Sequence, residues 1–276
     1  MSMPATRSIC FMTPAHAGEI RQFAVLRRSV QLFAPGFPHI VMVNREDLDE
    51  FVATFRNDLQ LEIVTTADIL PSDLERRRRK SDAGWLAGRW RRHRERLREC
   101  QARQLVRLYA LANCSYEAAA FVDADVFISR AASPGDFFVG ERLKLFRRRA
   151  VNAECLDLDV ATHEILGNPL HQITELYDYH FSPACFRKST AVQLFAQLER
   201  RKRSKWVRRF MAQQRPSEYN LLGYAATSLE SGAGYQLTER NPDELHHTIR
   251  VPHDQVEGAF EHIVAAQRAT ATAPQT

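Results

Sequence analysis

Apolar and polar positions in the first part of the chain predict strands and helices in alternation. Short apolar runs, each a candidate strand, cover residues 8–14, 39–44 and part of 61–70. Residues 16–34 place apolar side chains at helical spacing between the first two runs, and residues 45–56 predict a second helix. Strands and helices that alternate across short connections are typical of a parallel sheet in an α/β domain.

The rest of the chain continues this pattern. Residues 72–113 are expected to be helical, with Leu105, Leu108 and Leu111 as a buried stripe. The apolar run at 118–129 has apolar residues on both faces, as a central parallel strand does. Further strands are expected at 142–146, within 175–186 and, as the last strand, at 235–239, and further helices at 189–214 and 218–230. The expected fold class is α/β, a Rossmann-like, mixed and mostly parallel sheet flanked by helices, with a basic helical excursion.

Two carboxylates, Asp123 and Asp125, stand inside the apolar run AAAFVDADVFIS. Carboxylates are rarely buried unless they are paired or bind a metal. In an extended segment, residues two apart point the same way, ~6–7 Å from each other. Ligands of parallel sheets bind at the carboxyl ends of strands, and oxygen ligands suit Mg²⁺ or Mn²⁺. The alternative is a strand that ends early with both aspartates in a turn, against which the following VFI argues.

The stretch FVDADVFI resembles the DxD motif of GT-A-fold glycosyltransferases, which use it to hold a divalent metal against the diphosphate of a nucleotide sugar. From about residue 8 to about residue 250, the chain resembles a bacterial group of uncharacterised glycosyltransferase-like proteins. Those proteins carry a tryptophan, a glutamine-rich helix with a basic residue, the DxD strand and a later Ser-Glu-Tyr helix start. The matching residues are Trp85 or Trp90, then Gln101, Gln104 and Arg107 in QARQLVRL, and then Ser217, Glu218 and Tyr219 in PSEYNLLGY. Arg107 stands where lysine is more usual.

The resemblance implies a metal-dependent glycosyltransferase that moves a sugar from a nucleotide-sugar donor to the hydroxyl of a carbohydrate or glycolipid acceptor. Cell-surface polysaccharide or glycoconjugate synthesis is the implied setting. One GT-A-like domain is expected at 1–264, with a nucleotide-binding half at about 8–130 and an acceptor-binding half at about 131–264.

The same resemblance assigns roles to individual residues. It implies that Mn²⁺ or Mg²⁺ binds Asp123 and Asp125 together with one late histidine, His246 or His247. Contacts with the nucleotide-sugar donor are expected from Thr13, Gln101, Gln104, Arg107 and Asp123. The catalytic residue is expected to be Glu218.

Glu218 has two interpretations. An inverting transfer needs a base for the acceptor proton, and loss of such a base costs ~10²–10⁴ in rate. In the other interpretation, Ser217 is the N-cap of a helix and Glu218 lies in its first turn, where the helix dipole favours an acid. Loss of a helix-start carboxylate is expected to cost only ~0.3–1 kcal/mol of stability.

Composition narrows the class of protein. Apolar content of 45% and charged content of 26% over 276 residues are ordinary for a globular protein. No apolar run reaches the ~18 residues of a membrane helix, and we find no signal region, so the expected location is the cytoplasm, with peripheral contact at the inner membrane face. Five scattered cysteines without a CxxC pair predict reduced thiols. Residues 265–276 have too few large apolar groups to fold and are expected to be disordered.

Positive charge is concentrated in two runs. Between Asp73 and Arg107, 13 Arg or Lys stand against 5 Asp or Glu, a balance of +8, and because the chain carries +5 the remainder carries −3. A second basic run covers 200–209. Such runs suit an anionic acceptor, an anionic membrane or nucleic acid, or are solvated helix faces.

Two alternative functions remain. A nucleotidyltransferase is disfavoured because TPAHAGEI has a single glycine where a Gly-rich phosphate loop is expected. A non-catalytic nucleic-acid-binding protein would use the arginine-rich helices, but it gives no reason for Asp123 and Asp125, so nucleic acid is a disfavoured partner.

Overall fold

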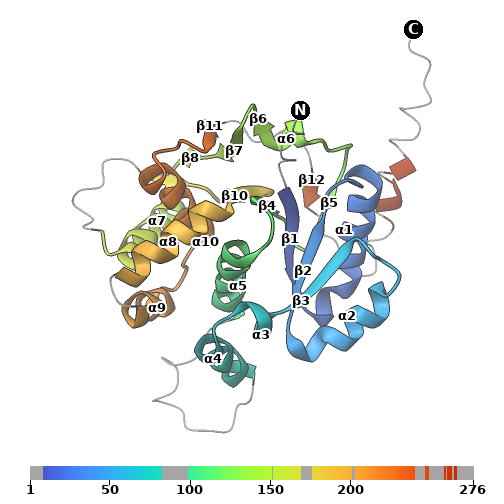
Figure 1. Cartoon of the computed structure of the whole chain (residues 1–276), viewed down its shortest axis with the longest axis horizontal. Coiled ribbons are helices and arrows are strands. Elements are labelled where there is room, and N and C mark those ends of the chain that lie inside the picture. Colours follow the sequence, from blue (N-terminus) through green and yellow to red (C-terminus); the bar gives the residue numbers. More distant parts are fainter. Residues whose placement is uncertain are drawn as a thin grey trace, which may run out of the picture.

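A five-stranded sheet between helices is the centre of the computed structural model (Figure 1). The described residues are 9–82, 99–150, 152–168, 176–200, 203–239, 246–248, 258, 260–262 and 264–265. Apart from Ala265, the tail expected to be disordered lies outside them, as do both tryptophans of the family resemblance, Trp85 and Trp90.

The central sheet is mixed and mostly parallel, which confirms the expected fold class. Its strands, in the order β10-β4-β1-β2-β3, are β10 (Ala184–Arg187), β4 (Ala118–Phe121), β1 (Ile9–Ala15), β2 (His39–Val43) and β3 (Leu61–Thr65). The four strands β4, β1, β2 and β3 are parallel, whereas β10 pairs antiparallel with β4. The sheet therefore takes strands from both of the halves expected from the sequence.

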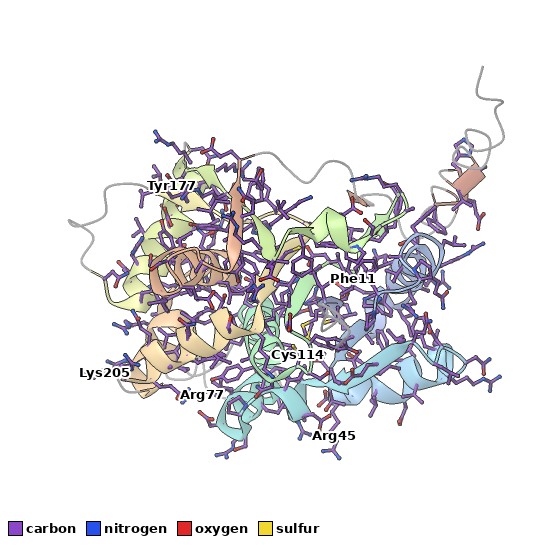
Figure 2. All side chains as sticks on the ribbon, turned by 45° about the horizontal axis from the view of Figure 1, so that its top comes forward. Phe11, Arg45, Arg77, Cys114, Tyr177 and Lys205 are labelled. Carbon is purple, nitrogen blue, oxygen red and sulfur yellow. The ribbon has the colours of Figure 1, made fainter. Side chains whose placement is uncertain are left out.

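Helices cover both faces of this sheet. In Figure 1, α1 (Ile20–Phe33) and α2 (Leu48–Phe55) lie on one side, and α5 (Glu99–Asn113) lies on the other, near α8 (Lys188–Arg200). The helix α5 is amphipathic as expected, because Leu105, Leu108 and Leu111 are fully buried. In Figure 2 the side chain of Phe11, from β1, is among the packed side chains of the interior, where it contacts Phe37 and Phe137.

Smaller elements complete the fold. A three-stranded sheet has the order β11-β7-β6, and two two-stranded sheets pair β12 with β5 and β8 with β9. These strands are β5 (Val126–Ile128), β6 (Phe138–Val139), β7 (Arg142–Phe146), β8 (Arg148–Arg149), β9 (Tyr177–Asp178), β11 (Tyr235–Thr238) and β12 (His246–Thr248). The remaining helices are η1 (Ala17–Glu19), η2 (Arg45–Asp47), α3 (Thr66–Ile69), α4 (Ser72–Asp82), α6 (Pro134–Phe137), α7 (Ala153–Leu166), α9 (Arg203–Ala212), α10 (Glu218–Tyr224) and η4 (Ala225–Leu229).

Some expected elements differ from the structure. The strand at 235–239 is not the last, since β12 follows it. The helix α7 has no counterpart among the expected elements, because its apolar and acidic residues do not form one clear stripe. The basic excursion is described only as far as Asp82, and not all of its arginines are solvated, since Arg78 is buried and pairs with Glu75 and Glu46.

The helix α10 is buried along its whole length and fastens the segment that links β9 to β10. The Ser217 hydroxyl caps the helix by accepting the Asn220 N–H at 3.1 Å, as expected for an N-cap. Asn220 Oδ1 in turn accepts the backbone N–H of Tyr179 at 3.0 Å. The ring of Tyr179 lies directly against Gly223, where no Cβ occupies the space. One face of α10 therefore fixes the backbone next to residue 180.

A buried carboxyl group on α7 makes stability depend on pH. Asp159 is fully buried, and its polar neighbours, the Tyr224 hydroxyl and the Tyr177 backbone N–H, only partly offset the cost of burying its charge. Burial raises the pKa of Asp159 from 3.8 to about 7. The folded state therefore binds this proton more tightly than the unfolded state, so the contribution of Asp159 to stability falls as pH rises from 3.8 to about 7 and stays low above that.

We expect Asp159→Asn to raise the melting temperature at pH 8, because the buried site no longer has to hold a charge. The difference between variant and wild type should shrink as pH falls toward 4. Thermal unfolding by circular dichroism at several pH values measures it, with Asp157→Asn as the control, since Asp157 lies exposed on the same helix. A melting-temperature difference that does not change with pH would contradict the assignment.

Candidate active-site cleft

The two aspartates of the DxD stretch lie in a turn and not within a strand. The strand β4 ends at Phe121, Val122 N–H still reaches Met12 O at 3.1 Å, and Val126 N–H closes the turn on Asp123 O at 3.3 Å. The continuous strand expected at 118–129 is therefore wrong, because VFI forms β5, which pairs with β12 in a different sheet. Both carboxylates are nevertheless at the carboxyl end of β4, beside β1, where parallel sheets bind ligands.

A cleft of about 560 Å³ opens at this edge of the sheet. Its walls come from the turn after β4, from the start of α1, from α5, from the segment before β10 and from the start of α10. The lining residues that can take part in binding or proton transfer are His16, Glu19, Arg103, Gln104, Arg107, Asp123, Asp125, His180, Glu218 and Tyr219.

Arg107 joins the two carboxylates that the sequence singles out. Its Nη1 donates to Glu218 Oε1 at 2.6 Å, and its Nη2 donates to Asp123 Oδ1. The side chain of Glu218 is 2% exposed, whereas that of Asp123 is 43% exposed. Burial by itself would lower the pKa of Arg107, but Tyr219, Asp123 and Glu218 raise it above its ordinary value. Arg107 is therefore a permanent cation that holds Asp123 at the mouth of the cleft.

The other residues of the glutamine-rich helix have different neighbours. Gln104 lines the cleft and its Nε2 donates to Pro216 O at 2.7 Å. Gln101 is fully buried outside the lining, and its Nε2 donates to the backbone oxygens of Met211 and Gln213 at 3.3 and 3.0 Å. Both amides thus tie α5 to the chain that leads into α10. These contacts help to fix the position of Arg107, which lies further along α5.

Thr13 lies apart from the cleft surface. Its side chain is fully buried, and its hydroxyl is hydrogen-bonded to His39 Nε2 at 3.0 Å. Burial lowers the pKa of His39 to about 3, so this ring is neutral. The neighbouring Pro14, not Thr13, lines the cleft, and the predicted contact of Thr13 with a nucleotide gains no support from this placement.

The backbone of the two late histidines lies near the DxD turn. His246 and His247 belong to β12, which runs antiparallel to β5 in a register that pairs His247 with Phe127 and Thr248 with Val126. The strand therefore runs toward Asp125, which directly precedes β5. The side chains of both histidines lie outside the described part of the structure, and a metal-binding role for either one stays a prediction.

The donor set of the cleft suits a hard divalent cation. Asp123 and Asp125 are neighbouring oxygen donors in a turn that opens to the cleft, and Mg²⁺ commonly takes one or two carboxylates together with substrate phosphates. Among the described residues, no group of three His, Cys, Asp or Glu side chains could hold a metal. The two aspartates therefore fit a cation that takes its other ligands from a bound diphosphate or from residues beyond the described ones.

A second compartment of about 430 Å³ adjoins the cleft over the carboxyl ends of β1 and β2. Pro14, His16, Gly18 and Arg103 line both spaces. Its far end is lined by Met42, Asn44, Asp47, Thr66 and Arg78. Together the two compartments can hold an extended ligand that reaches from β2 to the aspartates.

Several residues of the cleft were not identified from the sequence. Arg103 forms ion pairs with Glu19 and Glu99, to whose carboxylates it donates at 2.9 and 3.0 Å, and His16 Nε2 lies 3.6 and 3.8 Å from the same two carboxylates. His180 carried no recognisable pattern, since it stands in a short link between two strands. The aromatic neighbours YDYHF are the only local signal for it.

Comparisons with known proteins give a family and distant structural neighbours. The model of a family of unknown function (DUF6492) matches residues 7–262. No curated protein matches the sequence. Solved structures that match include the galactosyltransferase LgtC in complex with donor and acceptor sugar analogues, with a TM-score of 0.45, 11% identity and coverage of 97% of this chain and 98% of that chain.

Two further matches are similarly distant. Glucosyl-3-phosphoglycerate synthase from Mycobacterium tuberculosis, in complex with Mn²⁺, uridine diphosphate and phosphoglyceric acid, has a TM-score of 0.39, 13% identity and coverage of 98% of this chain and 81% of that chain. 4-Diphosphocytidyl-2C-methyl-D-erythritol synthase has a TM-score of 0.43, 9% identity and coverage of 95% of this chain and 100% of that chain. With TM-scores below 0.5, these likenesses carry no argument about activity.

Proposed function

The chain belongs to the family of unknown function DUF6492, and we propose that it is a glycosyltransferase that moves a sugar from a nucleotide-sugar donor to an acceptor hydroxyl with the help of Mn²⁺ or Mg²⁺. One observation carries this proposal: a two-compartment cleft at the carboxyl ends of parallel strands, with a pair of carboxylates at one end. The nucleoside occupies the compartment near Asn44 and Asp47, and the diphosphate reaches toward Asp123 and Asp125.

Asp123 and Asp125 would hold the cation, which would supply positive charge to neutralise the charge that develops on the leaving diphosphate. The chain's own residues orient this site. Arg107 holds Asp123 through Oδ1 and brings a permanent positive charge to the cleft, while Gln104 holds the backbone at Pro216. Direct contacts of Arg107 and Gln104 with the donor, and a metal bond from His246 or His247, belong to this proposal as further expectations. Contacts of Gln101 and Thr13 with the donor stay predictions without support from the cleft, because both side chains are fully buried outside its lining.

Glu218 contributes to transfer by keeping Arg107 in place. Glu218 lines the cleft at the start of α10, its Oε1 accepts a hydrogen bond from the guanidinium of Arg107, and its side chain is almost fully buried. A carboxylate in this position is suited to hold the neighbouring guanidinium of Arg107 in place.

The acceptor is proposed to be a carbohydrate or a glycolipid, in the synthesis of cell-surface polysaccharide or glycoconjugates. None of the described helices is long and apolar enough to cross a membrane. Contact with an anionic membrane would use the exposed basic residues of α4 and α9, including Arg76, Arg79, Lys205 and Arg208. Figure 2 shows Arg77 from α4 and Lys205 from α9 at the same side of the molecule.

Binding of nucleoside diphosphates to the purified protein tests this function. We expect UDP or GDP to bind more tightly with Mn²⁺ than without it, measured by isothermal titration calorimetry. Asp125→Asn should weaken the Mn²⁺-dependent binding at least ~10-fold, because loss even of a residue that only supports a metal ligand costs ~10–100-fold. Asp157→Asn, an exposed aspartate on α7, is the matched control. Equal affinity with and without Mn²⁺, in wild type and in Asp125→Asn, would refute the proposal.

A further inference from the structure

His180 lines the cleft at a point where hydrogen bonds to buried side chains hold the backbone. It stands between β9 and β10, where its backbone N–H donates to Asp178 Oδ1 at 2.9 Å. Asp178 is itself held by Arg148, which donates to Oδ2 from Nε at 3.0 Å and from Nη2 at 2.8 Å. Asn220 Oδ1 accepts the N–H of Tyr179, the residue before His180. The backbone that leads into His180 is therefore fixed by buried side chains, while His180 itself is exposed and lines the cleft.

The imidazole ring of His180 packs against Tyr219, whose ring also lies near the guanidinium of Arg107. The edge of one ring meets the face of the other in the His180–Tyr219 pair, with centroids 4.9 Å apart and an angle of 73° between the rings. The guanidinium of Arg107 lies 5.6 Å from the centroid of the same Tyr219 ring. Tyr219 thus fixes the position of His180 relative to Arg107, and through Arg107 relative to Asp123.

The other histidine and the carboxylates along the described lining have charged or polar neighbours or belong to the cation site: His16, Glu19, Asp123, Asp125 and Glu218. Glu19 pairs with Arg103, and His16 Nε2 lies 3.6 Å from Glu19 Oε1 and 3.8 Å from Glu99 Oε1. Glu218 is almost fully buried, and its Oε1 accepts a hydrogen bond from Arg107 Nη1 at 2.6 Å. His180 differs from these because it is exposed to the cleft and packs against the ring of Tyr219, with no hydrogen bond or ion pair to its imidazole from any residue that the structure describes.

We propose that His180 is the general base of the transfer, an assignment that rests on the proposed glycosyltransferase function. The acceptor hydroxyl gives its proton to a ring nitrogen of His180, and its oxygen forms a bond to the anomeric carbon of the donor sugar. The bond between that carbon and the diphosphate oxygen breaks, and the electron pair leaves with the diphosphate. Attack from the face opposite the leaving group inverts the configuration at the anomeric carbon.

The variant His180→Ala tests this assignment, with His262→Gln, an exposed histidine outside the cleft, as the control. The probes are UDP-glucose, UDP-galactose and GDP-mannose with Mn²⁺, and release of UDP or GDP is measured with water or simple methyl glycosides as acceptors. We expect nucleotide release to fall ~10²–10⁴-fold in His180→Ala, as for loss of a general base. Affinity for UDP with Mn²⁺ should stay within about threefold of wild type, since the base does not hold the leaving group.

Two further readouts separate a base from a structural role. Added imidazole should restore part of the nucleotide release of His180→Ala, but not that of Asp125→Asn. Proton NMR of the first product formed should show inverted anomeric configuration.

The outcomes distinguish the two proposals. A wild-type protein that binds neither UDP nor GDP with Mn²⁺, or binds one and releases no nucleotide from any probe, overturns the glycosyltransferase function, and the base assignment falls with it. Three results overturn the base assignment alone: a wild-type rate in His180→Ala, loss of UDP affinity in His180→Ala, or a retained anomeric configuration in the product.

Discussion

Replacing Arg107 by methionine should lower the free energy of unfolding by ~3–5 kcal/mol, the usual cost of removing one partner from a buried ion pair. Arg107 is 8% exposed, and its removal leaves Glu218, whose side chain is 2% exposed, without the guanidinium that it pairs with. Methionine retains most of the aliphatic volume, so the loss reports on charge rather than on packing. Urea unfolding followed by tryptophan fluorescence and circular dichroism measures the change.

A double variant provides the control for this prediction. Arg107→Met with Glu218→Gln removes both charges, and it should recover more than half of the stability lost in Arg107→Met, because the buried carboxylate is gone. Glu218→Gln by itself should cost less than Arg107→Met, ~1–3 kcal/mol, since Arg107 keeps Asp123 as a partner. This replaces the ~0.3–1 kcal/mol expected for a helix-start residue. A cost below ~1 kcal/mol for Arg107→Met would show that the pair does not stabilise the fold.

Gly223→Ala should destabilise the protein by at least ~2 kcal/mol, although alanine favours helices over glycine by ~1 kcal/mol. An added Cβ would come within 2.2, 2.3 and 2.4 Å of three ring atoms of Tyr179. That ring is 2% exposed and is bordered by the rings of Tyr177 and Tyr224, so it has no room to move aside. The measurement is again the free energy of unfolding in urea.

Gly36→Ala is the control for this prediction, because a Cβ at Gly36 meets no atom within 4 Å. Its stability should stay within ~0.5 kcal/mol of wild type. Combining Gly223→Ala with Tyr179→Leu should cost less than the sum of the two single changes, since the shorter side chain leaves room for the methyl group. Full additivity would mean that the close approach of Gly223 to Tyr179 does not limit this site.

The sequence predicted the central sheet because strand and helix periods are local properties. The runs at 8–14, 39–44 and 61–70 contain the strands β1, β2 and β3 almost as expected. The position of Asp123 and Asp125 at a strand end also followed from local pattern. Their turn did not, because the apolar VFI can continue a strand in one sheet or begin one in another, and only pairing with β12 decides between the two.

Contacts between distant residues could not be predicted from spacing. Arg107 and Glu218 are separated by 111 positions, and a resemblance that names both as site residues does not indicate that they bind each other. Thr13 is a second example, since a hydroxyl at the end of a strand was expected to face a ligand and its contact with His39 on the next strand could not be read from the sequence. His180 has no periodic neighbour, and its role depends on Tyr219 and Asn220, which lie further along the chain.

The antiparallel pairing of β10 with β4 has a consequence for the order of events during synthesis. Until residue 187 has left the ribosome, β4 is an open sheet edge with the apolar sequence AAAF, and open edges of this kind invite pairing between chains. The ion pair between Arg107 and Glu218 can form only later, after residue 218 has also left the ribosome. The nascent chain therefore passes through a stage in which the first strands are assembled but the cleft still lacks the segment before β10 and the start of α10. Co-translational aggregation, and rescue by chaperones that shield strand edges, should be concentrated in that interval.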